Sequence, residues 1–187
     1  METLVKSPFQ SAVNAGQARE RFASLLQAHH GIVLKVARSY CAHPQDRADL
    51  VQEISIQAWR AFPGYDEGRA RFSTWLYRIA LNVAISQLRG QRLRERYRAP
   101  FEQAEACAAP QPDDGRDEDL RRLEAAIATL PPLDRALMLL ALDDHGHREI
   151  GEILGLSAAN VGTRLHRLRE RIKRQLLGED TRNEHGQ

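Results

Sequence analysis

Apolar residues recur at helical spacing along most of this chain. A first run is expected within Ala18–Tyr40 and a second after Pro44. The apolar positions of these two runs are Phe22, Leu25, Leu26, Ile32, Val33 and Val36, then Leu50, Val51, Ile54 and Ala58. Steps of three and four residues place such side chains on one face of a helix. The sequence has no alternating strand pattern and no internal repeat, so it predicts an all-α fold.

A longer helix is expected to follow a loop at residues 64–71 and to run to about Arg98. Its apolar stripe consists of Leu76, Ile79, Ala80 and Val83. At about 100° per residue, a separate line of the same helix holds Trp75, Arg78, Asn82, Ser86 and Arg89. This phase places Trp75 with the arginines and away from the core stripe.

Residues 99–117 interrupt the pattern with three prolines, many acidic side chains and no usable period, which is typical of a flexible linker. Helical spacing resumes at Leu120 and is broken by Pro131 and Pro132. We therefore expect a flexible arm at 1–17, one helical domain at 18–98 and a second at 118–177, followed by a polar tail at 178–187.

The segment His147–His166 has the pattern of a helix-turn-helix. Ile150 and Ile153 face inward on a short helix, Gly155 makes the turn, and Ser157 can cap the second helix. That helix has one apolar stripe and one polar face. The stripe is Val161, Leu165, Leu168 and Ile172, and the face is Asn160, Thr163, Arg164, Arg167 and Arg171. Such a face suits the major groove of DNA, although a helical hairpin with a solvated basic face would share this pattern.

Charge and aromatic residues point to nucleic acid. The net charge of +2 conceals eight arginines against Glu95 alone in 68–98, and seven acidic residues against Arg116 alone in 101–119. Six of the eleven aromatic residues lie in 59–77, where they alternate with arginines. Aromatic rings stack on unpaired bases and guanidinium groups hold phosphates. Trp59 and Phe62 are expected to be packing residues, whereas the pattern leaves open whether Phe72 and Tyr77 belong to the core.

Other chemistry is scarce. Cys41 and Cys107 form no CxxC pair, which argues against a disulfide framework and suits a reducing cytoplasm. No apolar run is long enough to cross a bilayer, so no membrane insertion is expected. His29, His30, Cys41 and His43 could suggest a metal hydrolase, yet no HExxH motif accompanies them. No metal or other cofactor is expected.

These motifs together resemble a known family. Asp46–Glu53 (DRADLVQE) with Ala58–Trp59, and then Phe72–Ala80 (FSTWLYRIA) with Asn82, resemble region 2 of bacterial sigma factors. Leu130–Arg135 (LPPLDR) with the helix-turn-helix resembles region 4. Two such regions joined by a short linker are similar to the extracytoplasmic-function (ECF) group of the sigma-70 family. The resemblance implies a region 2 helical bundle and a region 4 helix-turn-helix, joined by the flexible acidic linker.

The resemblance also implies partners and site residues. Asp49, Gln52 and Glu53 match positions that bind the core enzyme of RNA polymerase, and their i, i+3, i+4 spacing places them on one helix face. By spacing alone they would be a solvated surface trio. The residues that match positions contacting the opened minus-ten element are Tyr65, Arg69, Arg71, Thr74, Trp75, Arg78 and Asn82. An anti-sigma factor is a further expected partner.

In region 4 the family reads the minus-thirty-five element with the second helix. The matching residues here are Ser157, Asn160, Thr163, Arg164, Arg167 and Arg171. The chain departs from the family pattern at Asn160, at His147, where an aromatic residue is usual, and at Gly162, where Lys or Arg is common. Glycine inside a helix costs about 1 kcal/mol relative to alanine, so Gly162 either permits a close backbone approach or is merely tolerated.

We expect a cytoplasmic sigma factor, and two other functions remain as alternatives. A helix-turn-helix regulator that binds duplex DNA without polymerase would explain the C-terminal module, but it leaves Asp46–Asn82 unexplained. An enzyme built on the histidines would need a metal site for which the sequence has no motif. We therefore expect a non-enzymatic initiation factor that binds core polymerase and promoter DNA, in a stress or envelope response.

Overall fold

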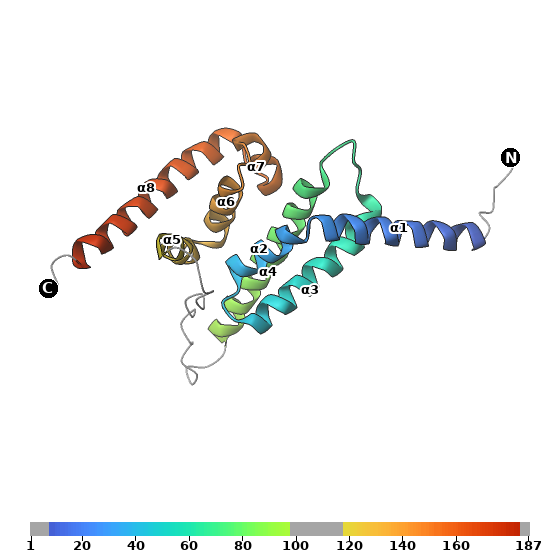
Figure 1. The fold of residues 1–187 in the computed structure, drawn as a ribbon, viewed down its shortest axis with the longest axis horizontal. Coiled ribbons are helices and arrows are strands. Elements are labelled where there is room, and N and C mark those ends of the chain that lie inside the picture. Colours follow the sequence, from blue (N-terminus) through green and yellow to red (C-terminus); the bar gives the residue numbers. More distant parts are fainter. Residues whose placement is uncertain (1–7, 98–117, 184–187) are drawn as a thin grey trace.

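The computed structural model describes residues 8–97 and 118–183, and every regular element within those ranges is a helix (Figure 1). The all-α prediction is confirmed for this part of the chain. The predicted linker at 99–117 lies outside the described residues, as do 1–7 and 184–187. Below, residues 8–97 are called the first half of the molecule and residues 118–183 the second half.

The first half is a bundle of helices. It contains α1 (Pro8–Ala28), α2 (His30–Tyr40), α3 (Pro44–Ala61), the 3-10 turn η1 (Phe62–Gly64) and α4 (Phe72–Tyr97). Helices α2, α3 and α4 pack against one another through the predicted apolar positions. Their most deeply buried large side chains are Val33, Val36, Leu50, Ile54, Leu76 and Leu81.

The second half contains α5 (Glu118–Ala128), α6 (Pro132–Leu142), α7 (His147–Leu154) and α8 (Ala158–Asn183). Helix α6 is apolar nearly all round, as expected for a helix that neighbours cover on several sides. It packs against α5, α7 and α8 on one side and against α2 and α4 of the first half on another. Figure 1 shows α8 reaching away from the first half at its C-terminal end.

Two predicted boundaries differ from the structure. Helix α1 begins at Pro8, so residues 8–17, which were expected in a flexible arm, are helical. Proline is favoured at the first position of a helix because its fixed φ suits the helix and its missing N–H has no partner there. Helix α8 likewise continues to Asn183, through most of the expected tail.

The helix-turn-helix is built as the sequence predicts. Gly155 ends α7 with φ of +70°, a conformation that favours glycine. The N–H of Leu156 donates to the carbonyl of Gly151 (2.9 Å), and Ser157 Oγ accepts from the N–H of Asn160 (3.3 Å), which confirms Ser157 as the cap of α8. The turn passes so close to α7 that a Cβ atom at Gly151 would lie 2.5 Å from the carbonyl oxygen of Leu156.

A polar interface joins the two halves. Arg135 of α6 is buried, and its guanidinium donates to the carbonyl of Ser39 (2.7 Å) at the end of α2. The hydroxyl of Tyr40 donates to the carbonyl of Pro132 (2.7 Å). Asp143 accepts a hydrogen bond from Tyr77 of α4 and forms an ion pair with Lys35 of α2.

Two glycine substitutions test the close approach in the helix-turn-helix. Gly151→Ala should lower the free energy of unfolding by about 1–3 kcal/mol, because its new methyl group meets backbone that cannot turn away. Gly90→Ala, within α4, should raise that free energy by about 0.5–1 kcal/mol, because nothing lies within 4 Å of its added Cβ. Urea denaturation of the full chain measures both. Equal effects of the two substitutions would contradict the packing described for Gly151.

Candidate nucleic-acid and polymerase interface

Six aromatic side chains form one continuous cluster at the end of the first half where α1, η1 and the start of α4 meet. We call it the aromatic cluster, and its members are Phe22, Trp59, Phe62, Tyr65, Phe72 and Trp75. Phe62 is its centre, with ring centroids 5.1 Å from Phe22, 5.9 Å from Tyr65 and 6.3 Å from Trp75. These distances are typical of packed aromatic pairs.

The aromatic residues that are buried in the structure differ in part from those expected to pack in the core. Phe72 is buried, as is Tyr77 nearby, so both belong to the core. Trp59, expected to be a packing residue, stacks on Phe62 but keeps 42% of its surface exposed. Trp75 is half-buried, with its ring centroid 5.0 Å from that of Tyr65 and 5.2 Å from that of Phe72. The contact with Phe72 follows from the i, i+3 spacing within α4, whereas the contact with Tyr65 comes from the loop before α4, which helical phase does not describe.

The loop at residues 65–71 is ordered by its own polar groups. Asp66 Oδ1 accepts from the N–H of Gly68 (2.9 Å), and its carbonyl accepts from the N–H of Arg69 (3.1 Å). Tyr65 donates from its hydroxyl to the carbonyl of Ala70 (3.2 Å). Partial burial, and next the neighbouring Glu67 carboxylate, raise the pKa of Tyr65. The side chains of Arg69 and Arg71 are left exposed on this loop.

The remaining predicted minus-ten residues do not share one environment. Arg78 and Asn82 are exposed along α4. Thr74 instead faces the second half, where its hydroxyl donates to Glu149 of α7 (2.9 Å). The structure thus brings Trp75, Tyr65 and the loop arginines together at one end of α4, while Thr74 lies in the interface between the halves.

Glu149 has two partners in that interface. His145 Nδ1 lies 3.0 Å from its Oε2, and the His145 ring packs edge-on against Tyr77 with a centroid distance of 5.3 Å. The hydrogen bond from His145 is the main cause that lowers the pKa of Glu149. Burial, followed by the hydrogen bond to Asp143, raises the pKa of Tyr77 far above its ordinary value, so the phenol stays protonated and donates. This network could not be predicted from the sequence, because the bonds of Thr74 and Tyr77 join residues of α4 to residues 66 and 75 positions later.

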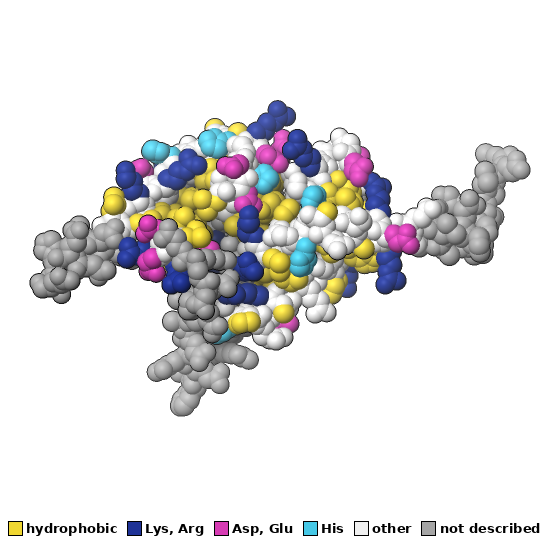
Figure 2. Space-filling view, in the orientation of Figure 1, with side chains coloured by type: hydrophobic (Ala, Val, Ile, Leu, Met, Phe, Trp, Pro, Cys, Tyr) yellow, Lys and Arg dark blue, Asp and Glu magenta, His cyan; other side chains and the backbone are white. Residues whose placement is uncertain are grey.

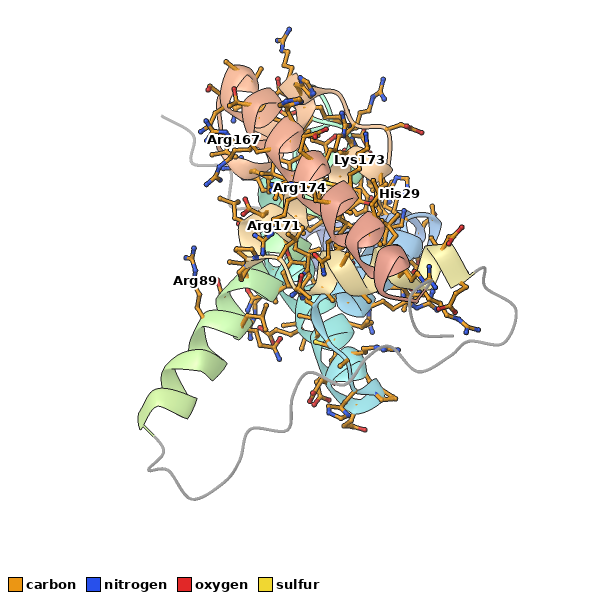
Figure 3. The ribbon with its side chains drawn as sticks, turned by 90° about the vertical axis from the view of Figure 1, so that its left-hand side faces the viewer. His29, Arg89, Arg167, Arg171, Lys173 and Arg174 are labelled. Carbon is orange, nitrogen blue, oxygen red and sulfur yellow. The ribbon has the colours of Figure 1, made fainter. Side chains whose placement is uncertain are left out.

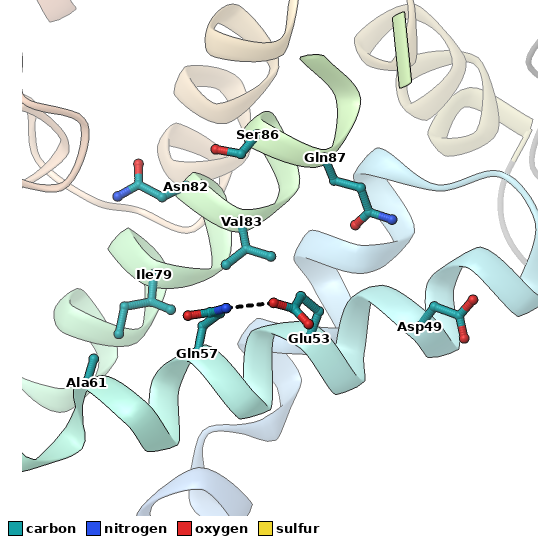
Figure 4. A pocket seen from close by; sticks show the side chains of 9 residues that line it. All are labelled: Asp49, Glu53, Gln57, Ala61, Ile79, Asn82, Val83, Ser86 and Gln87. Atoms are coloured by element: carbon teal, nitrogen blue, oxygen red, sulfur yellow. Dashed lines mark hydrogen bonds between the residues drawn. The ribbon is translucent and has the colours of Figure 1, made fainter. Parts of the chain in front are cut away.

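The predicted polymerase-binding residues Asp49, Gln52 and Glu53 are all exposed on α3. Asp49 and Glu53 line a groove of about 710 Å³ between α3 and α4, shown in Figure 4 with Asn82 on its other side. Glu53 accepts from Gln57 (2.7 Å) and Asp49 accepts from Gln45 (3.3 Å), bonds that leave both carboxylates at the surface. Gln52 lines a second depression, of about 360 Å³, between α2 and α3.

The exposed face of α8 carries most of the predicted upstream-element residues. The stripe of Val161, Leu165, Leu168 and Ile172 is buried, as predicted. On the exposed side lie Ser157, Asn160, Thr163, Arg167 and Arg171. Figure 3 shows Arg167, Arg171, Lys173 and Arg174 spread along this helix, and Figure 2 shows basic side chains over the end of the molecule that holds α7 and α8.

Two residues of this face differ from the sequence prediction. Arg164 is turned toward α6, where its Nη1 lies 4.0 Å from Asp134 Oδ1, and is only partly exposed. His166 was not predicted, although it is exposed between the positions of Thr163 and Arg167. It follows Thr163 by three residues, so helical spacing alone could have identified it.

Within residues 8–97 and 118–183, no group of three His, Cys, Asp or Glu side chains is placed to hold a metal ion. His29 stacks on Phe72 with a centroid distance of 5.4 Å. No helix in the same ranges is both long and apolar enough to span a bilayer.

Comparison with known proteins gives consistent matches for both halves. The family model for Sigma-70 region 2 matches residues 25–94, and that for Sigma-70, region 4 matches residues 120–172. RNA polymerase sigma factor CnrH of Cupriavidus metallidurans is 31% identical, over 86% of this chain and 90% of that protein. ECF RNA polymerase sigma-E factor of Escherichia coli K12 is 33% identical, over 68% of this chain and 72% of that protein.

Solved structures show the same fold. The structure of CnrH in complex with the cytosolic domain of CnrY matches with a TM-score of 0.62 and 24% identity, covering 89% of this chain and 96% of that one. The sigma factor RpoE of Bartonella quintana, in complex with the anti-sigma factor NepR, matches with the same TM-score and 21% identity, covering 86% and 96%. Both likenesses extend across the two halves.

Proposed function

The chain belongs to the extracytoplasmic-function group of sigma-70 family sigma factors, and we propose which surfaces of its two halves bind RNA polymerase and promoter DNA. As a member of this family it is an initiation factor and not an enzyme: it binds RNA polymerase core enzyme and directs promoter recognition. The observation that carries this function is the match of both sigma regions, in order, to the two helical halves. A DNA-binding regulator independent of polymerase would need only the second half.

Helix α3 is proposed to bind the core enzyme through Asp49, Gln52 and Glu53. The three side chains are exposed on one helix, and none is committed to an ion pair within the described residues. Two exposed apolar side chains, Ile56 and Trp59, continue the same helix and are 36% and 42% exposed. Carboxylates beside exposed apolar area suit a protein partner with basic and apolar side chains.

The aromatic cluster and its loop are proposed to hold the opened minus-ten strand. Arg69 and Arg71 can contact phosphates, while Tyr65 and Trp75 present partly exposed rings for stacking. Extruding a base costs a few kcal/mol, which stacking and phosphate contacts can offset. Arg78 and Asn82 extend this surface along α4. Thr74 can join it only after its bond to Glu149 breaks.

Helix α8 is proposed to enter the major groove of the minus-thirty-five element. Thr163, Arg167 and Arg171 lie on its exposed face, and Asn160 and Ser157 stand at its N-terminal end, where a recognition helix contacts base edges. Arg164 is proposed as a contact from the flank of this face.

The setting is proposed to be the cytoplasm, in a stress or envelope response, with an anti-sigma factor as regulator. The related sigma factors CnrH and RpoE were each solved with a bound protein, named as the cytosolic domain of CnrY and the anti-sigma factor NepR. A comparable partner would act on this chain by covering the surfaces assigned above to polymerase and DNA.

Reconstituted transcription tests the function directly. The purified chain, added to bacterial core polymerase and genomic DNA fragments, should give discrete transcripts that core polymerase alone does not give. Glu53→Ala with Asp49→Ala should weaken core binding while leaving the fold intact, because both side chains are exposed. DNA binding without any binding to core polymerase would refute the function and favour the regulator.

Trp75→Ala should impair promoter opening more than closed-complex formation, since stacking matters only after bases leave the duplex. Stacking is worth about 1–3 kcal/mol per base, or roughly 5- to 150-fold in the opening equilibrium. Permanganate reactivity of unpaired thymines measures opening, and filter binding of the closed complex at low temperature measures the earlier step. Trp75→Phe, which keeps an aromatic ring at the same position, is the matched control and should retain most of the opening. A similar loss in both steps would argue against strand stacking by Trp75.

Arg167→Ala should weaken recognition of the minus-thirty-five element by about 1–3 kcal/mol and leave core binding unchanged. The readout is holoenzyme affinity for promoter duplexes with a native or a scrambled upstream element. Arg122→Ala, which removes the same charge from α5, is the control. If the loss for Arg167→Ala persists on the scrambled duplex, the side chain does not read the element.

A further inference from the structure

A side chain from α7 fills the space beside α8 where residue 162 has none. His147 is the first residue of α7 and is exposed. A Cβ atom added to Gly162 would lie 3.2 Å from Nδ1 and 3.3 Å from Cε1 of His147. The imidazole therefore rests against the backbone of α8, and a larger residue at position 162 would displace it. Gly162 is thus a site of close approach.

Helical geometry places this contact on the flank of the recognition helix. Gly162 lies about 100° from the buried Val161 on one side and about 100° from the exposed Thr163 on the other. When a recognition helix enters the major groove, the first helix of the motif crosses the sugar–phosphate backbone. His147 belongs to that first helix and sits at its junction with the exposed face of α8.

Of the two ring nitrogens of His147, only Nδ1 lies close to residue 162. Nδ1 and Cε1 are the only His147 atoms within 4 Å of the added Cβ position, so Nε2 lies more than 4 Å from it. The nearby acidic side chains of α7 are engaged within the protein: Glu149 by His145 and Thr74, and Glu152 by Arg148 (3.2 Å). An anion approaching His147 therefore meets carboxylates that already have partners.

We propose that His147 donates a hydrogen bond from Nε2 to a backbone phosphate at the edge of the groove that α8 enters, and that Gly162 makes room for it. Imidazole N–H groups are donors, and phosphate oxygens accept a large share of the hydrogen bonds in protein–DNA complexes. The proposal rests on the proposed function of α8. It adds to that helix a positioning contact from its neighbour, which fixes the register of α8 on the duplex without reading a base.

The test uses holoenzyme assembled from the full chain and core polymerase, on a promoter duplex that it transcribes. Single neutral methylphosphonates replace each phosphate across the upstream element in turn. For the unsubstituted protein, replacement of the contacted phosphate should weaken binding roughly two- to tenfold, as expected for loss of one hydrogen bond. With His147→Ala that sensitivity should disappear at this phosphate and persist at the others.

Two further variants separate contact from packing. His147→Phe keeps a ring against Gly162 without a nitrogen, so it should behave like His147→Ala; if it behaves like the unsubstituted protein, the role is packing and the proposal fails. Gly162→Leu should also abolish the sensitivity, because its side chain displaces the ring, whereas the single methyl group of Gly162→Ala requires the ring to move by only a few tenths of an ångström. His166→Ala, whatever its effect on affinity, should leave that sensitivity in place.

The remaining outcomes are equally decisive. An unchanged methylphosphonate pattern in His147→Ala overturns the proposal, as does a change in base preference without loss of any phosphate sensitivity. Arg167→Ala distinguishes this failure from a failure of the proposed function. If Arg167→Ala weakens recognition while the His147 variants do nothing, only the phosphate contact is wrong. If Arg167→Ala has no effect either, α8 is not the recognition helix.

Discussion

The packing of the second half against the first depends on the buried guanidinium of Arg135. A guanidinium stays protonated in proteins, so an arginine side chain can be buried only where hydrogen bonds from the protein replace those from water. Its Nη atoms donate to the carbonyls of Ser39, Ala128 and Leu130, which lie at or just beyond the ends of α2 and α5, and its Cζ lies 5.2 Å from the Tyr40 ring centroid. Helix ends expose carbonyls and favour cations. One side chain thus fixes α2, α5 and α6 together, and α7 is brought against α4 as a result.

This docking has a direct bearing on the DNA-binding surface. Because α7 lies against the start of α4, the Thr74 hydroxyl donates a hydrogen bond to Glu149. Asp143 accepts a hydrogen bond from Tyr77 and forms an ion pair with Lys35. A hydroxyl has one proton to donate, so Thr74 cannot bond Glu149 and a DNA phosphate at once. Trp75, Arg78 and Arg69 are not held in this way: Trp75 packs on Phe62, Tyr65 and Phe72 of the first half, Arg78 is exposed, and Arg69 lies near Asp66 of its own loop. The charge of Arg71, by contrast, acts on the Glu149 carboxylate of α7. The surface assigned to the opened strand therefore contains residues that can contact DNA as the protein stands, and also Thr74, whose hydrogen bond to Glu149 must break first.

Most of the local structure followed from the sequence, whereas the contacts between distant segments did not. Apolar spacing located the stripe of α8, and Gly155 with Ser157 located the turn and the cap, because these features depend on neighbours a few residues apart. In α4 it located Leu76 and Ala80, but Ile79 and Val83 line the groove beside α3 and Leu81 is buried instead. Phase within α4 set Trp75 apart from the core, but Phe72, one turn earlier in α4, packs on it and the loop folds Tyr65 onto it. Arg164 had the right spacing for the DNA-facing side, yet Asp134, thirty residues earlier, draws it toward α6. Gly162 could not be interpreted until His147 was seen against it.

The placement of the two tryptophans has a spectroscopic consequence. Trp59 and Trp75 both pack on Phe62, and α5–α8 contain no tryptophan. Intrinsic indole emission consequently arises from the aromatic cluster alone, at one end of the first half. Opening of that cluster on a DNA strand, or its coverage by a protein, alters the solvent around both indoles, whereas docking of α8 on duplex DNA leaves them untouched. The protein thus carries an unlabelled optical probe that distinguishes events at its strand-binding end from events at its duplex-binding end.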